Sequence, residues 1–418
     1  MNSRFWQEPY RLFFPLGILI GFIGIGHWLI YGIGWSHSYS GFFHANLQMQ
    51  GYMSCFVFGF LMTALPRFTS SAPTTRSETL LQFFLMLSLV AAYSFEQFII
   101  GEILFMLLLA HLVLFAVRRV KKKPSHIHPP VEFIWILSAL AHGLIGCSIL
   151  IAAQIGWMPK TNMTLGAYLV NHGFLLSIVL GVGSFLGPRI MGTFKLDRMT
   201  YDSEQKKVLE RKKKRRLIVH LSSSIILFTS YFLMSIRHFE TGALMQALLI
   251  SFIFFWTGTL TIKPKVTDLY VKLLCLSFWF IFVGAWAVVF MPTMKLALYH
   301  LLFIGGYTLM TFAVATMVIM SHGGMPHKLR DRSWRLSLLG AFILIALIIR
   351  IVCVAFPEWY FSLLGIVATI WMVGAILWLS YVSPYLGRMP DSKTVEQAHE
   401  EAKKRVLGDQ VKNDGHSC

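Results

Sequence analysis

The sequence predicts an all-α protein, a polytopic transmembrane helical bundle of about twelve spans. Apolar runs of about 20 residues recur along the chain, which is the length needed to cross the hydrocarbon core of a bilayer. Of the 418 residues, 56% are hydrophobic and 13% are charged, whereas a soluble domain carries about 25% charged residues. The mean hydropathy of +0.63 points the same way. Few residues are left over for a soluble domain, and a lipid membrane is the expected surrounding.

The apolar runs place the expected spans. They lie near 13–35, 43–66, 79–96, 98–117, 132–155, 164–187, 216–236, 242–262, 270–291, 297–320, 335–356 and 359–382. The segment 79–117 could also form one kinked pair or a re-entrant structure, with Glu96 and Gln97 at its turn.

The net charge of +18 first suggests nucleic acid, but the distribution of the charges excludes that partner. With an inner N-terminus, nearly all Lys and Arg residues fall in the two tails or in alternate loops. The exceptions, on or near the outer side, are Lys160, Arg237, Lys295 and Arg350. This positive-inside pattern predicts that both termini are cytoplasmic. The run RKKKRR (211–216) is interpreted as a topology anchor that touches anionic lipid.

The basic loops divide the spans into three groups of four helices. The expected units are 1–117, 118–262 with a basic cytoplasmic loop at 188–216, 263–383, and a polar cytoplasmic tail at 384–418. The segment MQGYMSCFVFGFLMTALPRF (49–68) aligns without gaps on NHGFLLSIVLGVGSFLGPRI (171–190), and the tenth span shares its early Gly-Tyr. These similarities favour a threefold repeat of four-helix units.

Four histidines are expected in the outer leaflet: His27, His44, His172 and His300. The last three lie at equal intervals on spans two, six and ten, although the gap-free alignment sets Gln50 opposite His172. Polar groups at this depth are costly, so they normally face the bundle and have a function. Neutral imidazoles suit axial ligation of haem, or binding of copper or zinc. The alternative is that each histidine only hydrogen-bonds a neighbouring helix.

Other polar residues could support such a site. Asn46, Gln48 and Gln50 could orient an imidazole or simply join helices. Arg350 could neutralise a haem propionate or extend toward the outer surface. The chain has no CxxCH motif, so a haem would be of the b type. His142, in span five, is expected to be structural.

Carboxylates are the residues that a proton-coupled transporter usually places at mid-membrane. No Asp or Glu is expected deep within a span, and Glu102 lies near the end of one. A twelve-span transporter or copper permease without a redox cofactor stays open as an alternative to a haem protein, as does a scaffold for a respiratory complex.

Three segments carry a resemblance to a known family. FHANLQMQGYMSCFVFGFLMTALPRFTS (43–70) resembles the second-helix signature of the NnrS family. YHLLFIGGYTLMTFAVATMVIMSHGG (299–324) and GPRIMGTF (187–194) are similar to two further segments of that family. The resemblance implies a haem- and copper-containing protein of the bacterial inner membrane, linked to nitric oxide stress and denitrification. It also implies nitric oxide or an electron donor as a partner, and a layout like that of haem-copper oxidase catalytic subunits.

The resemblance implies particular ligands. His44, His300 and His322 match histidines of the family motifs, and are the expected metal ligands. Asn46 stands where the family has a second histidine, and Gln48 where it has a methionine, so copper is expected less than haem b. The sequence leaves open whether the protein turns over a substrate.

Overall fold

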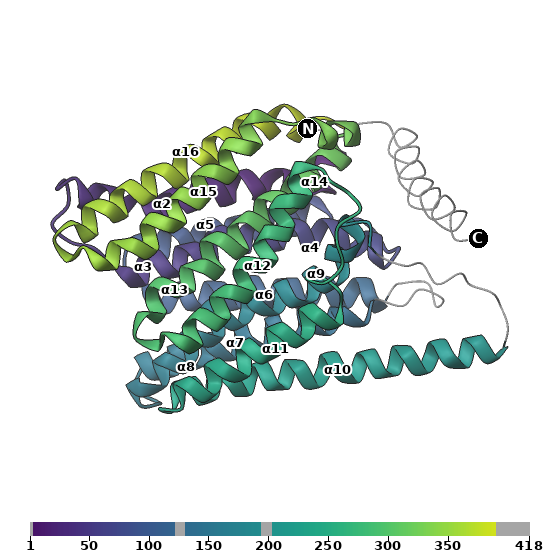
Figure 1. The fold of residues 1–418 in the computed structure, drawn as a ribbon, viewed down its shortest axis with the longest axis horizontal. Helices are drawn as coiled ribbons and strands as arrows, with labels where there is room; N and C mark the ends of the chain where they lie inside the picture. The colour runs from purple at the N-terminus through teal and green to yellow at the C-terminus, as the bar shows by residue number, and fades with distance from the viewer. Residues whose placement is uncertain (1–2, 122–129, 194–202, 390–418) are drawn as a thin grey trace.

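The computed structural model describes residues 3–121, 130–193 and 203–389, which form helices and no strand. The helices lie side by side in one bundle (Figure 1). Within these residues, eleven helical stretches are long and apolar enough to cross a membrane: Tyr10–Gly32, Arg76–Ser94, Phe98–Lys121, Val131–Gln154, Lys160–Ile190, Lys207–Ser235, Phe239–Trp256, Leu269–Phe290, Pro292–His322, Trp334–Ala355 and Pro357–Leu386. The predicted all-α membrane bundle is therefore confirmed.

Most expected spans consist largely of one α-helix. These helices are α2 (Tyr10–Gly32), α5 (Arg76–Ser94), α6 (Phe98–Lys121), α7 (Ile134–Gln154), α10 (Ser203–Ser235), α11 (Phe239–Trp256), α12 (Leu269–Phe290), α15 (Trp334–Val352) and α16 (Tyr360–Leu386). The short α1 (Ser3–Trp6) precedes them. Between α5 and α6 the chain turns at Glu96, whose φ is 56°. The segment 79–117 is thus two helices.

Spans two, six and ten are composite, each with a π-helical segment between two α-helices. They are α3 (Gly41–Asn46), η1 (Leu47–Met53) and α4 (Ser54–Phe68); α8 (Met163–Tyr168), η4 (Leu169–Gly173) and α9 (Phe174–Ile190); and α13 (Lys295–His300), η6 (Leu301–Thr308) and α14 (Leu309–His322). The first of them is absent from the eleven apolar stretches, because polar residues such as Gln48 and Gln50 dilute its apolar run.

The π-helical segments decide between the two sequence registers. Segments η1 and η4 begin at Leu47 and Leu169, the same offset as in the gap-free alignment. His44 lies before η1, whereas His172 lies inside η4. The equal spacing of the histidines therefore does not mark equivalent positions. π-Helical segments are rare and often occur at functional sites.

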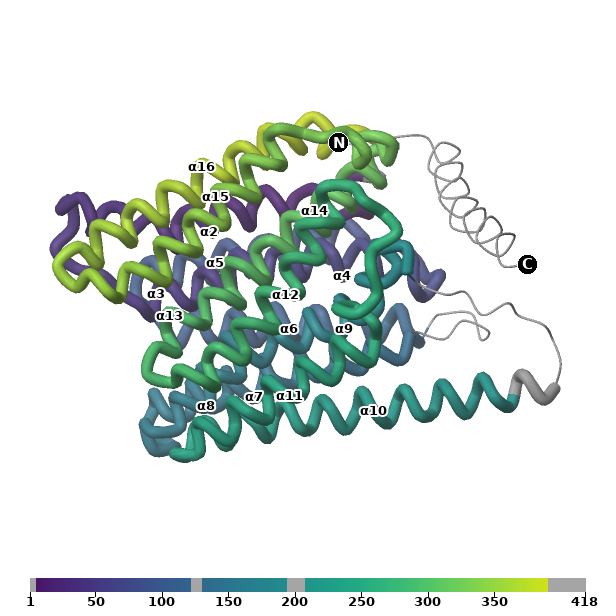
Figure 2. The backbone as a smooth tube through the Cα atoms, in the orientation of Figure 1, coloured from purple at the N-terminus to yellow at the C-terminus, as the bar shows by residue number. Residues whose placement is uncertain are grey.

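The composite spans lie at the centre of the bundle. The stretches Lys160–Ile190 and Pro292–His322 are 78% and 72% buried, against at most 56% for the other nine described stretches. An apolar cavity of about 80 Å³ lies between the composite spans and α2. Around it, Thr311 Oγ1 donates to Met53 Sδ at 3.6 Å. Figure 2 shows α4, α9 and α14 crossing the middle of the tube trace.

Helix α2 and the last described helix, α16, meet at one end of the bundle, which we call the terminal end (Figure 1). Arg11 Nη1 donates to the Leu386 carbonyl at 2.5 Å and so joins α2 to α16. Glu8 forms ion pairs with both Arg11 and Arg67 at 2.5 Å. We call the opposite end, where α2 ends and α3 and α13 begin, the histidine end.

The basic segment expected as a loop at 188–216 is partly helical. Helix α9 continues to Ile190, and α10 already begins at Ser203. Lys, Arg, Glu and Gln have high helix propensity, so this polar segment extends the span without a break. Figure 1 shows α10 reaching beyond the other helices. The division into three units stays a prediction, and residues 390–418 of the expected tail lie outside the described residues.

Candidate functional site

Four of the expected site residues come together at the histidine end. The rings of His27 and His44 have centroids 6.0 Å apart. His300 lies close enough to His44 and Arg350 for their charges to interact, and His44 interacts with Arg350 in the same way. Helices α2, α3, α13 and α15 contribute one residue each. Spans two and ten thus place their first histidines at one site, which we call the His44–His300 site.

The backbone fixes the ring of His44. Helix α3 begins after Ser40, whose hydroxyl accepts from the Phe43 amide at 3.1 Å. This cap starts the helix one turn before His44. His44 Nδ1 lies 2.9 Å from the carbonyl oxygen of Gly24. A carbonyl oxygen only accepts, so Nδ1 carries the proton, and the Nε2 of the neutral ring keeps its lone pair.

His300 is held in the same way. Its Nδ1 lies 2.8 Å from the Leu296 carbonyl, one helical turn earlier. Within the described residues, neither His300 nor His44 makes a hydrogen bond through Nε2. An imidazole whose Nδ1–H is held by a carbonyl, with Nε2 uncommitted, is the usual state of a metal-ligating histidine.

Arg350 adds a buried positive charge to this site. Arg350 is 6% exposed, and its guanidinium makes no ion pair within the described residues. Its polar contact is Cys353 Sγ at 3.6 Å, and its guanidinium lies 6.0 Å from the Tyr360 ring centroid. A buried cation without a counter-ion is costly. An anionic group beside Arg350 would therefore stabilise it.

His27 lies beside His44 on the neighbouring helix. Its ring is 4.4 Å from the Trp28 ring and 5.5 Å from the Phe43 ring, between centroids. The carbonyl of Ser40 is near, yet neither ring nitrogen makes a hydrogen bond of ordinary geometry. His27 is thus a third imidazole with uncommitted nitrogens at the site.

The polar residues that follow His44 make no hydrogen bond to its ring within the described residues. Gln48 Nε2 donates to the Gly21 carbonyl at 3.0 Å, and Gln50 Nε2 donates to Glu102 Oε1 at 3.1 Å. Asn46 Nδ2 is buried without a partner. The orienting role considered for these residues belongs to the backbone carbonyls, and Gln48 and Gln50 join helices instead.

Glu102 lies near the start of α6, as the sequence predicts, and is nevertheless buried. The residue is 0% exposed, and its carboxyl contacts side chains of η1, α5 and α7, namely Gln50, Tyr93 and Cys147. Tyr93 Oη donates to Gln50 Oε1 at 2.6 Å, and Cys147 Sγ donates to Glu102 Oε2 at 3.1 Å. A buried carboxyl thus exists in this membrane bundle. Its position near a helix end in sequence gave no signal of its burial.

His172 lies apart from the His44–His300 site. Its ring packs among aromatic side chains, with centroids 4.6 Å from Tyr299 and 4.9 Å from Phe303. The Phe303 ring is also 5.9 Å from the His300 ring. The Phe303 ring thus contacts both His172 and His300.

His322 lies at the terminal end, so the set His44, His300 and His322 is not one metal site. It ends α14, about 30 Å along the composite span from His300 at 1.5 Å per residue. There His322 Nδ1 lies 3.4 Å from Glu8 Oε1, and its ring also contacts the Arg67 guanidinium. Across the described residues, no three His, Cys, Asp or Glu side chains form a group that could hold a metal ion.

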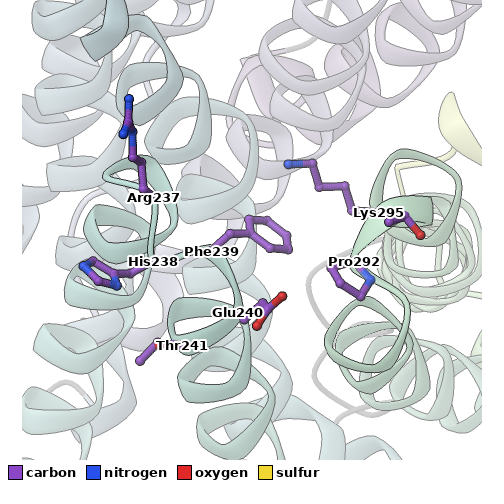
Figure 3. Close-up of a pocket in the computed structure, with 8 residues that line it drawn as sticks. Arg237, His238, Phe239, Glu240, Thr241, Pro292 and Lys295 are labelled. Carbon is purple, nitrogen blue, oxygen red and sulfur yellow. The ribbon is translucent and has the colours of Figure 1, made fainter.

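Two of the outer cations border a surface hollow of about 500 Å³ at the histidine end. Figure 3 shows Phe239 and Lys295 reaching into it from opposite sides, while Arg237 points away. The Lys295 ammonium lies 4.2 Å from the Phe239 ring centroid. The cations that border the hollow therefore do not converge on one point.

The chain matches the model of a known protein family. The model of a family described as NnrS protein matches residues 4–389. No curated protein matches the chain. The match includes all four residues of the His44–His300 site.

Proposed function

The chain belongs to the NnrS family, and from this premise we propose that it is a haem-binding membrane protein that serves in the nitric oxide response or in redox reactions linked to denitrification. Haem b would be held at the His44–His300 site. Bound haem supplies one-electron redox chemistry and, where an axial position is open, a place for nitric oxide. The protein's own residues would set the tautomer and the orientation of the histidines that hold it.

One observation carries this proposal. His44 and His300, on facing central spans, each give Nδ1–H to a backbone carbonyl and keep Nε2 uncommitted. Both rings are thus held in the neutral, ligating tautomer before any cofactor binds. Arg350, buried without a counter-ion, would pair with a propionate of the haem. His27 would limit the rotation of His44.

The distribution of basic residues predicts the orientation of the protein in the membrane. The terminal end would face the cytoplasm of a bacterium, because the basic segments of α6 and α10 lie there. The His44–His300 site would then lie near the outer face of the inner membrane. An electron donor on that side, or nitric oxide from the membrane, would have access to it.

The test is an absorption spectrum of the purified full chain, oxidised and reduced, with iron analysis of the same sample. Substitutions His44→Ala and His300→Ala should each abolish the Soret band of the native haem and lower bound iron. His238→Ala changes an exposed histidine at the same end and should leave both unchanged. Full haem in both site variants would refute the ligand assignment. A colourless, iron-free wild type from haem-replete cells would favour the transporter instead.

A further inference from the structure

We propose that the apolar cavity between the composite spans and α2 binds one small, uncharged gas molecule of low polarity. The cavity has a volume of about 80 Å³, and we call it the central cavity. Spans two, six and ten contribute Met53, Ile178 and Met310 to its wall, and α2 contributes Phe14. It is separate from the His44–His300 site.

The wall of the central cavity is uncharged and almost entirely apolar. Among the lining residues, Tyr307 and Thr311 are the ones that carry a polar hydroxyl. Thr311 Oγ1 already donates to Met53 Sδ at 3.6 Å, which leaves the Tyr307 hydroxyl as the free polar group of the wall. A buried water needs two to four polar partners, and an ion needs several ligands. The wall therefore favours a neutral, apolar guest over water or an ion.

The size of the central cavity selects a small guest. In another protein, an apolar cavity of about 150 Å³ stays dry and binds benzene or xenon. The central cavity has about half of that volume, so it suits a diatomic gas or a xenon atom and is too small for a larger ring. Each of its lining residues is buried or half-buried, whereas a lipid chain needs a groove that is open along its length. The fitting guest is therefore a gas molecule rather than a lipid tail.

Two π-helical segments end at the central cavity. Met53 is the last residue of η1, and Tyr307 is the next-to-last residue of η6. Such segments often occur at functional sites. Met53 follows His44 by nine residues and Tyr307 follows His300 by seven, which places the cavity about 14 Å and about 11 Å further along the two spans. The spans that carry the His44–His300 site thus also build this cavity, deeper in the bundle.

The membrane is the natural source of the guest. Phe60, Val182 and Val314 line the central cavity and are only half-buried. A smaller cavity of about 10 Å³ shares Phe60 and Val182 with it and continues the apolar space. Gases of low polarity dissolve better in hydrocarbon than in water, so the guest would enter past these side chains. Binding of this kind needs no haem, and the inference therefore stands apart from the proposed function.

The experiment is X-ray diffraction from crystals of the full chain under xenon pressure, in which the anomalous signal locates bound xenon. Wild type should hold one xenon atom between Met53, Ile178 and Met310. Ala315→Leu should lower the xenon occupancy about tenfold, because Ala315 lines the cavity and the larger side chain fills it. Ala341→Leu makes the same change at an exposed position of α15 and should leave the occupancy unchanged.

Three results would overturn the proposal: wild type without xenon in the central cavity, wild type whose cavity already holds ordered water or a lipid chain, or unchanged occupancy in Ala315→Leu. If Ala315→Leu does not fold, Val179→Ile adds a single methylene to the same wall and should lower the occupancy in the same direction. Iron analysis of the same samples reports the His44–His300 site. Xenon without iron would refute the proposed function alone, and iron without xenon would refute the gas site alone.

Discussion

Loss of the Glu8 carboxylate should destabilise the terminal end of the bundle. Glu8 lies just before α2 and pairs with Arg11 and Arg67 at 2.5 Å. Burial alone would raise the pKa of Glu8. The hydrogen bond to His322 and the charges of His322, Arg11 and Arg67 oppose it, and they lower the pKa from 4.5 to about 2.

The size of the effect follows from this pKa shift. A carboxyl whose pKa is lower in the folded state stabilises that state above its unfolded pKa, and loses the contribution as the pH falls toward its folded pKa. The shift from 4.5 to about 2, at 1.36 kcal/mol per pKa unit, gives about 3 kcal/mol. This contribution should be complete above pH 4.5 and should disappear between there and pH 2.

The assay compares wild type with Glu8→Gln by denaturation in mixed detergent and SDS, at several pH values. At neutral pH, Glu8→Gln should lose about 3 kcal/mol, and the two curves should converge as the pH falls below 4.5. Glu358→Gln removes an exposed carboxylate at the other end and should change little. Equal stability of wild type and Glu8→Gln at neutral pH would refute the reasoning, as would a difference that persists unchanged at pH 2.

Three further changes test the packing. Glu102→Ala leaves the Gln50 amide and the Cys147 thiol without their acceptor and should cost at least about 2 kcal/mol in detergent denaturation, whereas Glu102→Gln should cost less; equal losses would contradict the network. Gly51→Ala places a Cβ 2.6 Å from Ile20 Cγ2 and should lower stability by about 1–3 kcal/mol, and the double variant Gly51→Ala/Ile20→Ala should lose less than the sum of the two single losses. Arg119→Lys replaces two 2.6 Å bonds to Glu78 by one point charge and should lower the melting temperature; an unchanged melting temperature would show that this pair contributes little.

Hydropathy predicts the fold because membrane insertion depends on the composition of whole windows. The same averaging loses local detail. It cannot place the π-helical segment after Asn46, because backbone hydrogen-bond spacing leaves no mark on composition. It also does not show that α10 continues to Ser203, since a polar segment reads equally as loop or as exposed helix.

The candidate site is predictable in part. The sequence singles out His44, His300 and Arg350, because polar residues within a membrane span are costly and normally have a function. The tautomers of His44 and His142 depend on the carbonyls of Gly24 and Ser138, and only the packed backbone reveals those partners.

The π-helical segments have a consequence for how such a protein can change. A π-turn closes over one residue more than an α-turn. Deleting one residue from η1 would restore α-helical spacing and rotate Gly41–Asn46 by about 100° relative to Ser54–Phe68. His44 would then point toward a different neighbour, while the half of the span beyond η1 kept its packing. A single codon gained or lost in this segment is thus enough to redirect His44, so evolution can change the surroundings of this side chain without rebuilding the core.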